Sequence, residues 1–112
     1  MTDSQTIAHQ FLDALVANDA AKLEAVLTED AGLLMARCDS GIVQRPRRRV
    51  IQTLMEESAR WSDAAVHLHS LIADDARVAM EFRIQATENA RYVEHNRSAF
   101  LMLKDARIQF IN

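Results

Sequence analysis

The stretch from residue 76 to residue 103 constrains this chain most, because apolar and polar side chains alternate along it. Val78, Met80, Phe82 and Ile84 are each separated by one small or polar residue. This period of two is typical of a half-buried antiparallel strand. The alternation is interrupted at Asn89-Ala90. A two-residue turn at that point predicts a β-hairpin with one buried face.

A turn at Asn89-Ala90 also determines which residues of the hairpin face one another. A two-residue turn gives three central pairs: Ile84 with His95, Phe82 with Arg97, and Met80 with Ala99. The inner face would then carry these residues: Val78, Met80, Phe82, Ile84, Val93, His95, Arg97, Ala99, Leu101 and Leu103. A slip by one residue would instead turn Glu94, Asn96 and Ser98 inward. We predict the first register, because it separates apolar from polar side chains more completely.

The N-terminal half predicts helices. Residues 4–17 and 47–61 both place apolar side chains at helical spacing, and a short helix between them would turn Leu23, Val26 and Leu27 inward. Thr28-Glu29-Asp30 is typical of a turn, residues 32–36 of a short strand, and residues 37–46 of a loop. Strands are expected over 64–73, 76–88, 91–104 and 107–112. Helices followed by strands predict one α+β domain over residues 1–112, with three helices packed on an antiparallel sheet.

Composition excludes several classes of protein. The formal net charge of −3 gives no general attraction to nucleic acid or to an anionic membrane. No apolar run approaches the roughly 20 residues that span a bilayer, and the first residues lack the pattern of a secretion signal. A single cysteine, Cys38, excludes an intrachain disulfide. We therefore expect a cytoplasmic protein that binds neither nucleic acid nor membrane, and we read the arginines at 45 and 47–49 as a solvated face.

Four segments in this order resemble one fold family: FLDALVANDAAKLEAVLTEDAGLLM, RRRVIQTL, IADDARVAMEF and FLMLKDARIQF. The order is similar to that of the NTF2-like cone, and within it to the SnoaL-like and ketosteroid-isomerase-like branch. The resemblance covers nearly the whole chain and implies a strongly curved sheet around a pocket. Ala106 stands where the family usually has glycine in the last turn.

The family includes isomerases, polyketide cyclases, dehydratases, epoxide hydrolases and proteins that only bind ligands, so the fold alone does not assign a function. The resemblance aligns the isomerase's tyrosine with Phe11, its general base with Met35 and its protonated aspartate with Ala99. None of these three side chains can donate or accept a proton. Ketosteroid isomerase chemistry is therefore not expected.

His95 and Arg97 are the strongly polar residues of the predicted inner face. A buried arginine needs a carboxylate partner or an anionic ligand, and histidine can act as an acid or base near neutral pH. We expect His95, and Asp39 in the loop, as candidate catalytic residues; the alternative is that His95 and Arg97 lie wet and structural at the mouth of the cone. The expected ligand-binding residues are Phe11, Leu15, Met35, Leu54, Trp61, Met80, Phe82, Ile84, Arg97, Ala99 and Leu101.

His67 and His69 share one face of a strand, a spacing that can bind metal. A three-residue loop at Asp74-Asp75-Ala76 would turn Val66, Leu68, Ser70 and Ile72 inward and set His69 opposite Glu81, whereas a two-residue loop would turn both histidines inward. Apolar burial favours the three-residue loop. Because no third ligand is evident, we expect no metal and no cofactor.

Three functions remain open. The chain would bind a small hydrophobic molecule with a carbonyl group, either as an isomerase-, cyclase- or dehydratase-type enzyme or as a binding domain without catalysis. The third function is an association module. In each case a homodimer could form through the outer sheet face, where Tyr92, Phe100 and Met102 supply apolar area.

Overall fold

The computed structural model describes residues 3–35 and 43–112 of the chain. In the order of the sequence, the elements are α1 (Ser4–Val16), α2 (Ala20–Val26), β1 (Leu27–Leu34), β2 (Val43–Gln44), α3 (Arg47–Ser58), β3 (Ser62–Ala73), β4 (Arg77–Glu88), β5 (Arg91–Lys104) and β6 (Arg107–Ile111). The strands form one sheet in the order β2-β1-β6-β5-β4-β3. Neighbouring strands are antiparallel except β1 and β6, which run parallel. The predicted α+β class is confirmed.

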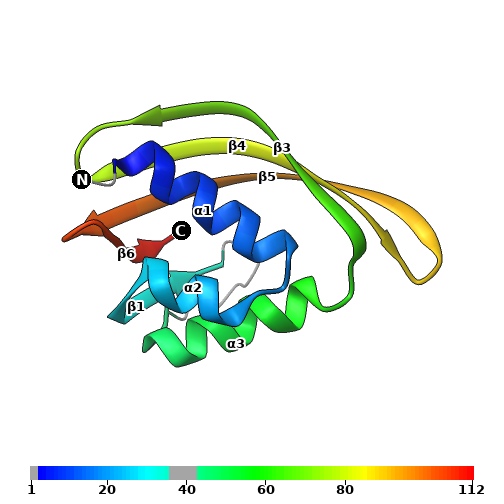
Figure 1. The fold of residues 1–112 in the computed structure, drawn as a ribbon, viewed down its shortest axis with the longest axis horizontal. Coiled ribbons are helices and arrows are strands. Elements are labelled where there is room, and N and C mark those ends of the chain that lie inside the picture. The colour runs from blue at the N-terminus through cyan, green and yellow to red at the C-terminus, as the bar shows by residue number, and fades with distance from the viewer. Residues whose placement is uncertain (1–2, 36–42) are drawn as a thin grey trace.

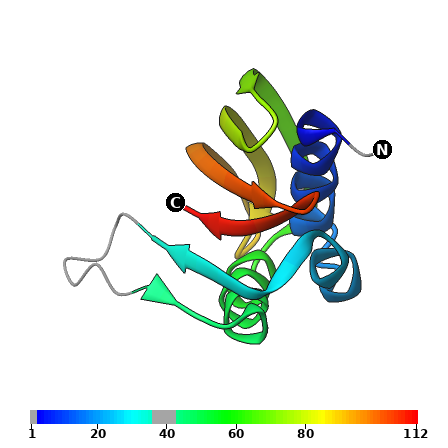
Figure 2. The ribbon, with the colours of Figure 1, turned by 90° about the vertical axis from the view of Figure 1, so that its left-hand side faces the viewer.

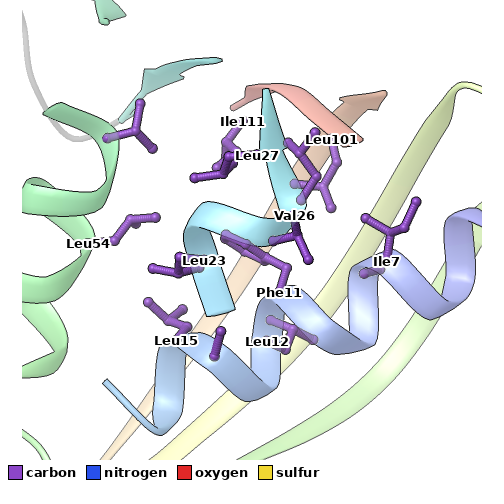
Figure 3. Packing of buried hydrophobic residues seen from close by; sticks show 14 of the residues in the cluster. Ile7, Phe11, Leu12, Leu15, Leu23, Val26, Leu27, Leu54, Leu101 and Ile111 are labelled. Atoms are coloured by element: carbon purple, nitrogen blue, oxygen red, sulfur yellow. The ribbon is translucent and has the colours of Figure 1, made fainter. Parts of the chain in front are cut away.

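The three helices lie against one face of the curled sheet, and β3, β4 and β5 arch over α1 (Figures 1 and 2). Asp3 and Asp19 cap α1 and α2 by accepting hydrogen bonds from backbone N–H groups of the first turn. The apolar stripe of α1 is buried as the helical spacing predicts, with Phe11 and Leu12 only 3% and 1% exposed. Figure 3 shows these side chains among those of α2, Leu54 of α3, and Leu101 and Ile111 of the sheet. The core therefore lies between the helices and the sheet.

The predicted register of the β4–β5 hairpin is confirmed. Ile84 faces His95, Phe82 faces Arg97 and Met80 faces Ala99. Asn89 and Ala90 both have positive φ, of 53° and 63°, which is the backbone of a type I′ turn and matches the twist of the two strands. The inner face of β4 is buried over its whole length.

The β3–β4 pairing combines the two registers that the sequence left open. Next to the turn, Ser70 faces Glu81 and Leu71 faces Met80, which is the two-residue-loop register and leaves Ile72 75% exposed. One extra residue, His69, then shifts the pairing, so that Leu68 faces Phe82 as a three-residue loop would require. This β-bulge turns Leu68 inward. The register predicted for a three-residue loop is therefore correct for residues 65–68 and wrong for residues 70–73, between the bulge and the turn.

The boundary between α2 and β1 differs from the prediction. The helix ends at Val26, and Leu27 opens β1, where it is fully buried opposite Ile108. The residues expected to form a turn, Thr28-Glu29-Asp30, lie in β1 where its pairing with β6 is irregular. Burial of Leu27 against β6 thus extends the strand past three polar residues, and local polarity alone could not show this.

The third helix is shorter than predicted. It ends at Ser58 and not at Trp61, so Trp61 lies in the connection just before β3. Among residues 3–35 and 43–112, no helix has the length and hydrophobicity needed to cross a membrane.

Candidate functional site

A cavity of about 280 Å³ lies between α1, α3 and the inner face of the sheet. α1 contributes Phe11 and Leu15 to its wall, and α3 contributes Leu54 and Glu57. The rest of the wall comes from β1, β4, β5 and β6 and from the residues that directly follow β1 and β6. These residues are Leu33, Leu34, Met35, Phe82, Arg97, Ser98, Ala99, Ile111 and Asn112. The described part of this wall is mainly apolar and includes the charged residues Glu57 and Arg97.

That charged pair is Glu57 of α3 with Arg97 of β5. The Glu57 carboxylate accepts a hydrogen bond from the Arg97 guanidinium. The Glu57 side chain is 7% exposed and the Arg97 side chain 28% exposed. Because a buried arginine is costly alone, a carboxylate partner or an anionic ligand was expected for Arg97, and Glu57 is a carboxylate partner.

Glu57 itself was missed by sequence reasoning. It follows Leu54 by three residues and Val50 by seven, and this helical spacing places it on the buried face of α3. The signal was therefore present in the periodicity. Periodicity alone did not identify it because a glutamate is seldom buried unless it is paired, and the pairing with Arg97 is a tertiary contact.

The three positions that the resemblance aligned with isomerase catalytic groups all line this cavity. Phe11, Met35 and Ala99 come from α1, the end of β1 and β5 respectively. Each presents a side chain without an acidic or basic group to the cavity. At the two positions that the resemblance aligned with carboxylic acids of ketosteroid isomerase, the described wall therefore has Met35 and Ala99.

Of the other predicted binding residues, Trp61 is not among those that line the cavity, and the rest fall into two groups. Leu15, Leu54 and Phe82 line the cavity with Arg97. Met80, Ile84 and Leu101 are at most 2% exposed and belong to the packed core, and they are not among the residues that line this cavity. Asp39 and Cys38 lie outside the described residues.

His95 and Trp61 meet just beyond the Glu57–Arg97 pair. His95 precedes Arg97 by two residues on β5 and so points to the same face, and its ring centroid is 5.8 Å from that of Trp61. The Nε2 atom of His95 and the Nε1 atom of Trp61 are both buried. Neither has a hydrogen-bond partner among the residues that the structure describes.

His67 and His69 lie away from the cavity. Their ring centroids are 5.6 Å apart in an edge-to-face arrangement, and both residues are exposed. His67 faces Arg83 across the strands. Within the described part of the chain, no three His, Cys, Asp or Glu residues are grouped as a metal site would require.

The arginines before and within α3 make contacts inside the protein. Arg45 donates a hydrogen bond to the Asp30 carbonyl and lies 5.7 Å above the centre of the Phe110 ring. Arg47 forms an ion pair with Glu24 of α2, at 3.5 Å. These contacts give two of the four arginines a structural role.

Comparison with known proteins gives the following matches. A family model described as a SnoaL-like domain matches residues 8–109. Similar solved structures include an LEH-like epoxide hydrolase from M. tuberculosis, with 23% identity and a TM-score of 0.76 over 94% of this chain and 76% of that one. No curated protein matches the chain.

Two further structures have similar folds. A loop-truncation variant of IdmH has 17% identity and a TM-score of 0.80, over 96% of this chain and 88% of that one. A protein of ketosteroid isomerase-like fold from Catenulispora acidiphila, in complex with trimethylamine, has 12% identity and a TM-score of 0.79, over 98% and 84% of the two chains. At these identities the likeness shows the fold alone.

Proposed function

Because this chain belongs to the SnoaL-like domain family, we propose that it binds a small hydrophobic molecule with a carbonyl group in the cavity between α1, α3 and the sheet. The observation that carries the proposal is the composition of the cavity wall. Among the described residues of the wall, apolar side chains surround the ion pair of Glu57 with Arg97. Small-molecule sites commonly combine such a wall with a few fixed polar groups.

Arg97 supplies the polar contact in this proposal. Only one hydrogen bond of its guanidinium, to Glu57, is found among the described residues, and a guanidinium carries five N–H donors. The remaining donors suit a carbonyl oxygen. They also suit the negative charge that develops on that oxygen when a proton is removed from the adjacent carbon.

The catalytic form of the proposal is an isomerase-, cyclase- or dehydratase-type reaction. His95 would move the proton and Arg97 would hold the developing anion, with Asp39 as a further candidate base. The alternative form is a binding domain that uses the same cavity without turnover. The resemblance of the fold to an epoxide hydrolase supports a small-molecule ligand in either form.

A screen of hydrophobic carbonyl compounds by thermal shift tests the binding proposal. The variant Ala99→Leu fills part of the cavity and should abolish the shift, whereas Ala65→Leu, on an exposed part of β3, should leave it unchanged. Equal responses of both variants would contradict binding in this cavity. If a compound is turned over, an unchanged rate in His95→Ala would end the catalytic form.

The outer sheet face supports a second proposal, a homodimer. Tyr92, Phe100 and Met102 are 59%, 39% and 46% exposed, and Ile72 adds a 75% exposed side chain across from Ala79 and Phe100. A hollow of about 430 Å³ lies among these strands, lined in part by Ile72 and Phe100. Exposed apolar area of this kind is typical of association surfaces.

Sedimentation velocity at micromolar concentration tests the dimer. We expect a dimer that Ile72→Asp together with Phe100→Asp converts to a monomer, since both changes place charge in the interface. His67→Asp, on an exposed position elsewhere on β3, is the matched control. A wild-type protein that sediments as a monomer would end this proposal.

A further inference from the structure

Two buried polar atoms on the inner face of the protein have no hydrogen-bond partner within residues 3–35 and 43–112. They are Trp61 Nε1 and His95 Nε2, and no other side-chain nitrogen or oxygen buried in the described residues is without a hydrogen bond. Trp61 as a whole is 9% exposed. A buried donor without an acceptor is unfavourable and is rare in folded proteins. These two atoms therefore need an explanation.

Their position relates them to the cavity. Glu57 and Trp61 are four residues apart on the α3 side, and Arg97 and His95 are two residues apart on one face of β5. Glu57 contacts Arg97 and Trp61 contacts His95, so the two pairs are successive layers between the same elements. The first layer lines the cavity and its charges satisfy each other. Trp61 and His95 are not among the residues that line the cavity, and the two buried nitrogen atoms of this second layer have no hydrogen-bond partner among the described residues.

The chemistry of the two atoms defines what would satisfy them. The indole Nε1–H of Trp61 can only donate. His95 Nε2 either donates or accepts, depending on its tautomer. One oxygen atom meets both requirements: a carbonyl oxygen accepts from both nitrogens, and a hydroxyl accepts from Trp61 and donates to His95.

We propose that Trp61 and His95 form the polar subsite that binds the oxygen atom of the ligand, a ketone or an alcohol, next to the cavity and beyond the Glu57–Arg97 pair. This inference rests on the proposed small-molecule function and adds to it a binding role for the Trp61 N–H. It assigns the ligand class as a hydrophobic ring or chain with one oxygen-bearing end. In this arrangement Trp61 and His95 take the place given above to Arg97 as the groups that bind the ligand's oxygen.

The single tryptophan of the chain makes this subsite directly observable. The indole N–H of Trp61 gives one resonance in a ¹H–¹⁵N spectrum. We would titrate with three probes of matched shape: cyclohexanone, cyclohexanol and methylenecyclohexane. The expected result is a saturable downfield shift of the indole proton with the two oxygen-bearing probes and a smaller or opposite shift with the hydrocarbon. Affinity should be at least about tenfold higher for the ketone or the alcohol.

Variants separate the subsite from the cavity. Trp61→Phe keeps a large aromatic ring and removes only the N–H, so it should bind the hydrocarbon as the wild type does and lose the preference for oxygen. His95→Leu should lose the same preference. His67→Leu, on the exposed outer face, should keep it.

Three outcomes would overturn the inference. If all three probes bind with equal affinity and shift the Trp61 resonance equally, Trp61 and His95 do not bind the ligand's oxygen, although the cavity still binds ligands. If the indole N–H exchanges magnetisation with water and keeps its shift at saturating ketone, the pair holds an internal water only. If no probe binds to the wild type, both the subsite and the proposed function fail.

Discussion

Glu57 on α3 and Arg97 on β5 form an ion pair across the wall of the cavity, although 40 residues separate them in the sequence. The pair joins the third helix to the centre of the sheet. It also places a carboxylate and a guanidinium in the wall of the cavity, next to mainly apolar side chains. Its energetic contribution can be measured by removing each partner separately.

We expect Glu57→Leu to lower the free energy of unfolding by about 2 kcal/mol, because it leaves Arg97 in the wall without this carboxylate. The value is below that of a fully buried pair because the Arg97 side chain is 28% exposed. The double variant Glu57→Leu with Arg97→Leu should recover most of the loss. Urea unfolding of the wild type, the two single variants Glu57→Leu and Arg97→Leu, and the double variant gives the coupling energy of the pair.

Glu56→Leu is the control for this cycle, since Glu56 is exposed and its side chain accepts a hydrogen bond from Gln52 on the same helix. It should change stability by less than about 0.5 kcal/mol. Additive effects of Glu57→Leu and Arg97→Leu would show that the pair is not coupled.

Two alanines adopt a backbone conformation that favours glycine. Ala90 and Ala106 have φ of 63° and 61°, each as the second residue of a two-residue hairpin turn. Because the left-handed conformation costs a residue with a Cβ atom about 1 kcal/mol, Ala90→Gly and Ala106→Gly should each stabilise the protein by up to about that amount. Thermal unfolding measures this. Ala86→Gly, in the buried middle of β4, should destabilise instead.

Asn18 connects the ends of α1 and α3. Its φ is 52°, and its side-chain Nδ2 donates to Ser58 Oγ at 2.6 Å and to the Met55 carbonyl at 3.2 Å. Asn18→Gly keeps the backbone freedom and loses both bonds, so it should cost about 1 kcal/mol. Asn18→Ala adds the strain of positive φ and should cost about 1 kcal/mol more. Equal stabilities of the two variants in urea would contradict this division.

Asp74 gives the turn before β4 a dependence on pH. The backbone N–H of Ala76 and the Arg77 side chain donate hydrogen bonds to its carboxylate and hold the pKa of Asp74 below its ordinary value of 3.8. A lowered pKa in the folded state means that the charged carboxylate stabilises the fold above pH 3.8, and that this contribution is lost as the pH falls below that value.

Asp74→Asn should therefore lower the free energy of unfolding at pH 7. As the pH is lowered below 4, the free energies of unfolding of the variant and the wild type should approach each other. Chemical unfolding at several pH values compares the two proteins. Asp75→Asn, the next residue of the same exposed turn, serves as the control. If the free energies of unfolding of the wild type and Asp74→Asn differ by the same amount from pH 7 to pH 3, the charge of Asp74 is not the cause of the difference.

The parts of the structure that were predicted from the sequence depend on local rules. The register of β4 and β5 follows from one turn and strict alternation, so Phe82 could be placed opposite Arg97 from the sequence. The order of helices and strands likewise follows from periodicity. This was enough to predict the class of fold and much of the cavity wall.

The parts that were not predicted depend on tertiary contacts. The bulge at His69 changes the register inside a strand whose side chains are apolar on both sides of it, so the pattern could not locate the shift. Leu27 opens a strand because Ile108, 81 residues later, covers it. The pairing of Glu57 with Arg97 required the angle between α3 and the sheet, which no local pattern encodes.

Binding in the cavity is the central claim, and two methionine methyl groups test it most directly. Met35 lines the cavity and Met102 is 46% exposed on the outer sheet face. In a ¹³C-methyl-methionine NMR titration with cyclohexanone, we predict a saturable shift of the Met35 methyl resonance while that of Met102 stays in place. A Met35 resonance that does not move at saturating probe, or a shift at Met102 alone, would contradict the account.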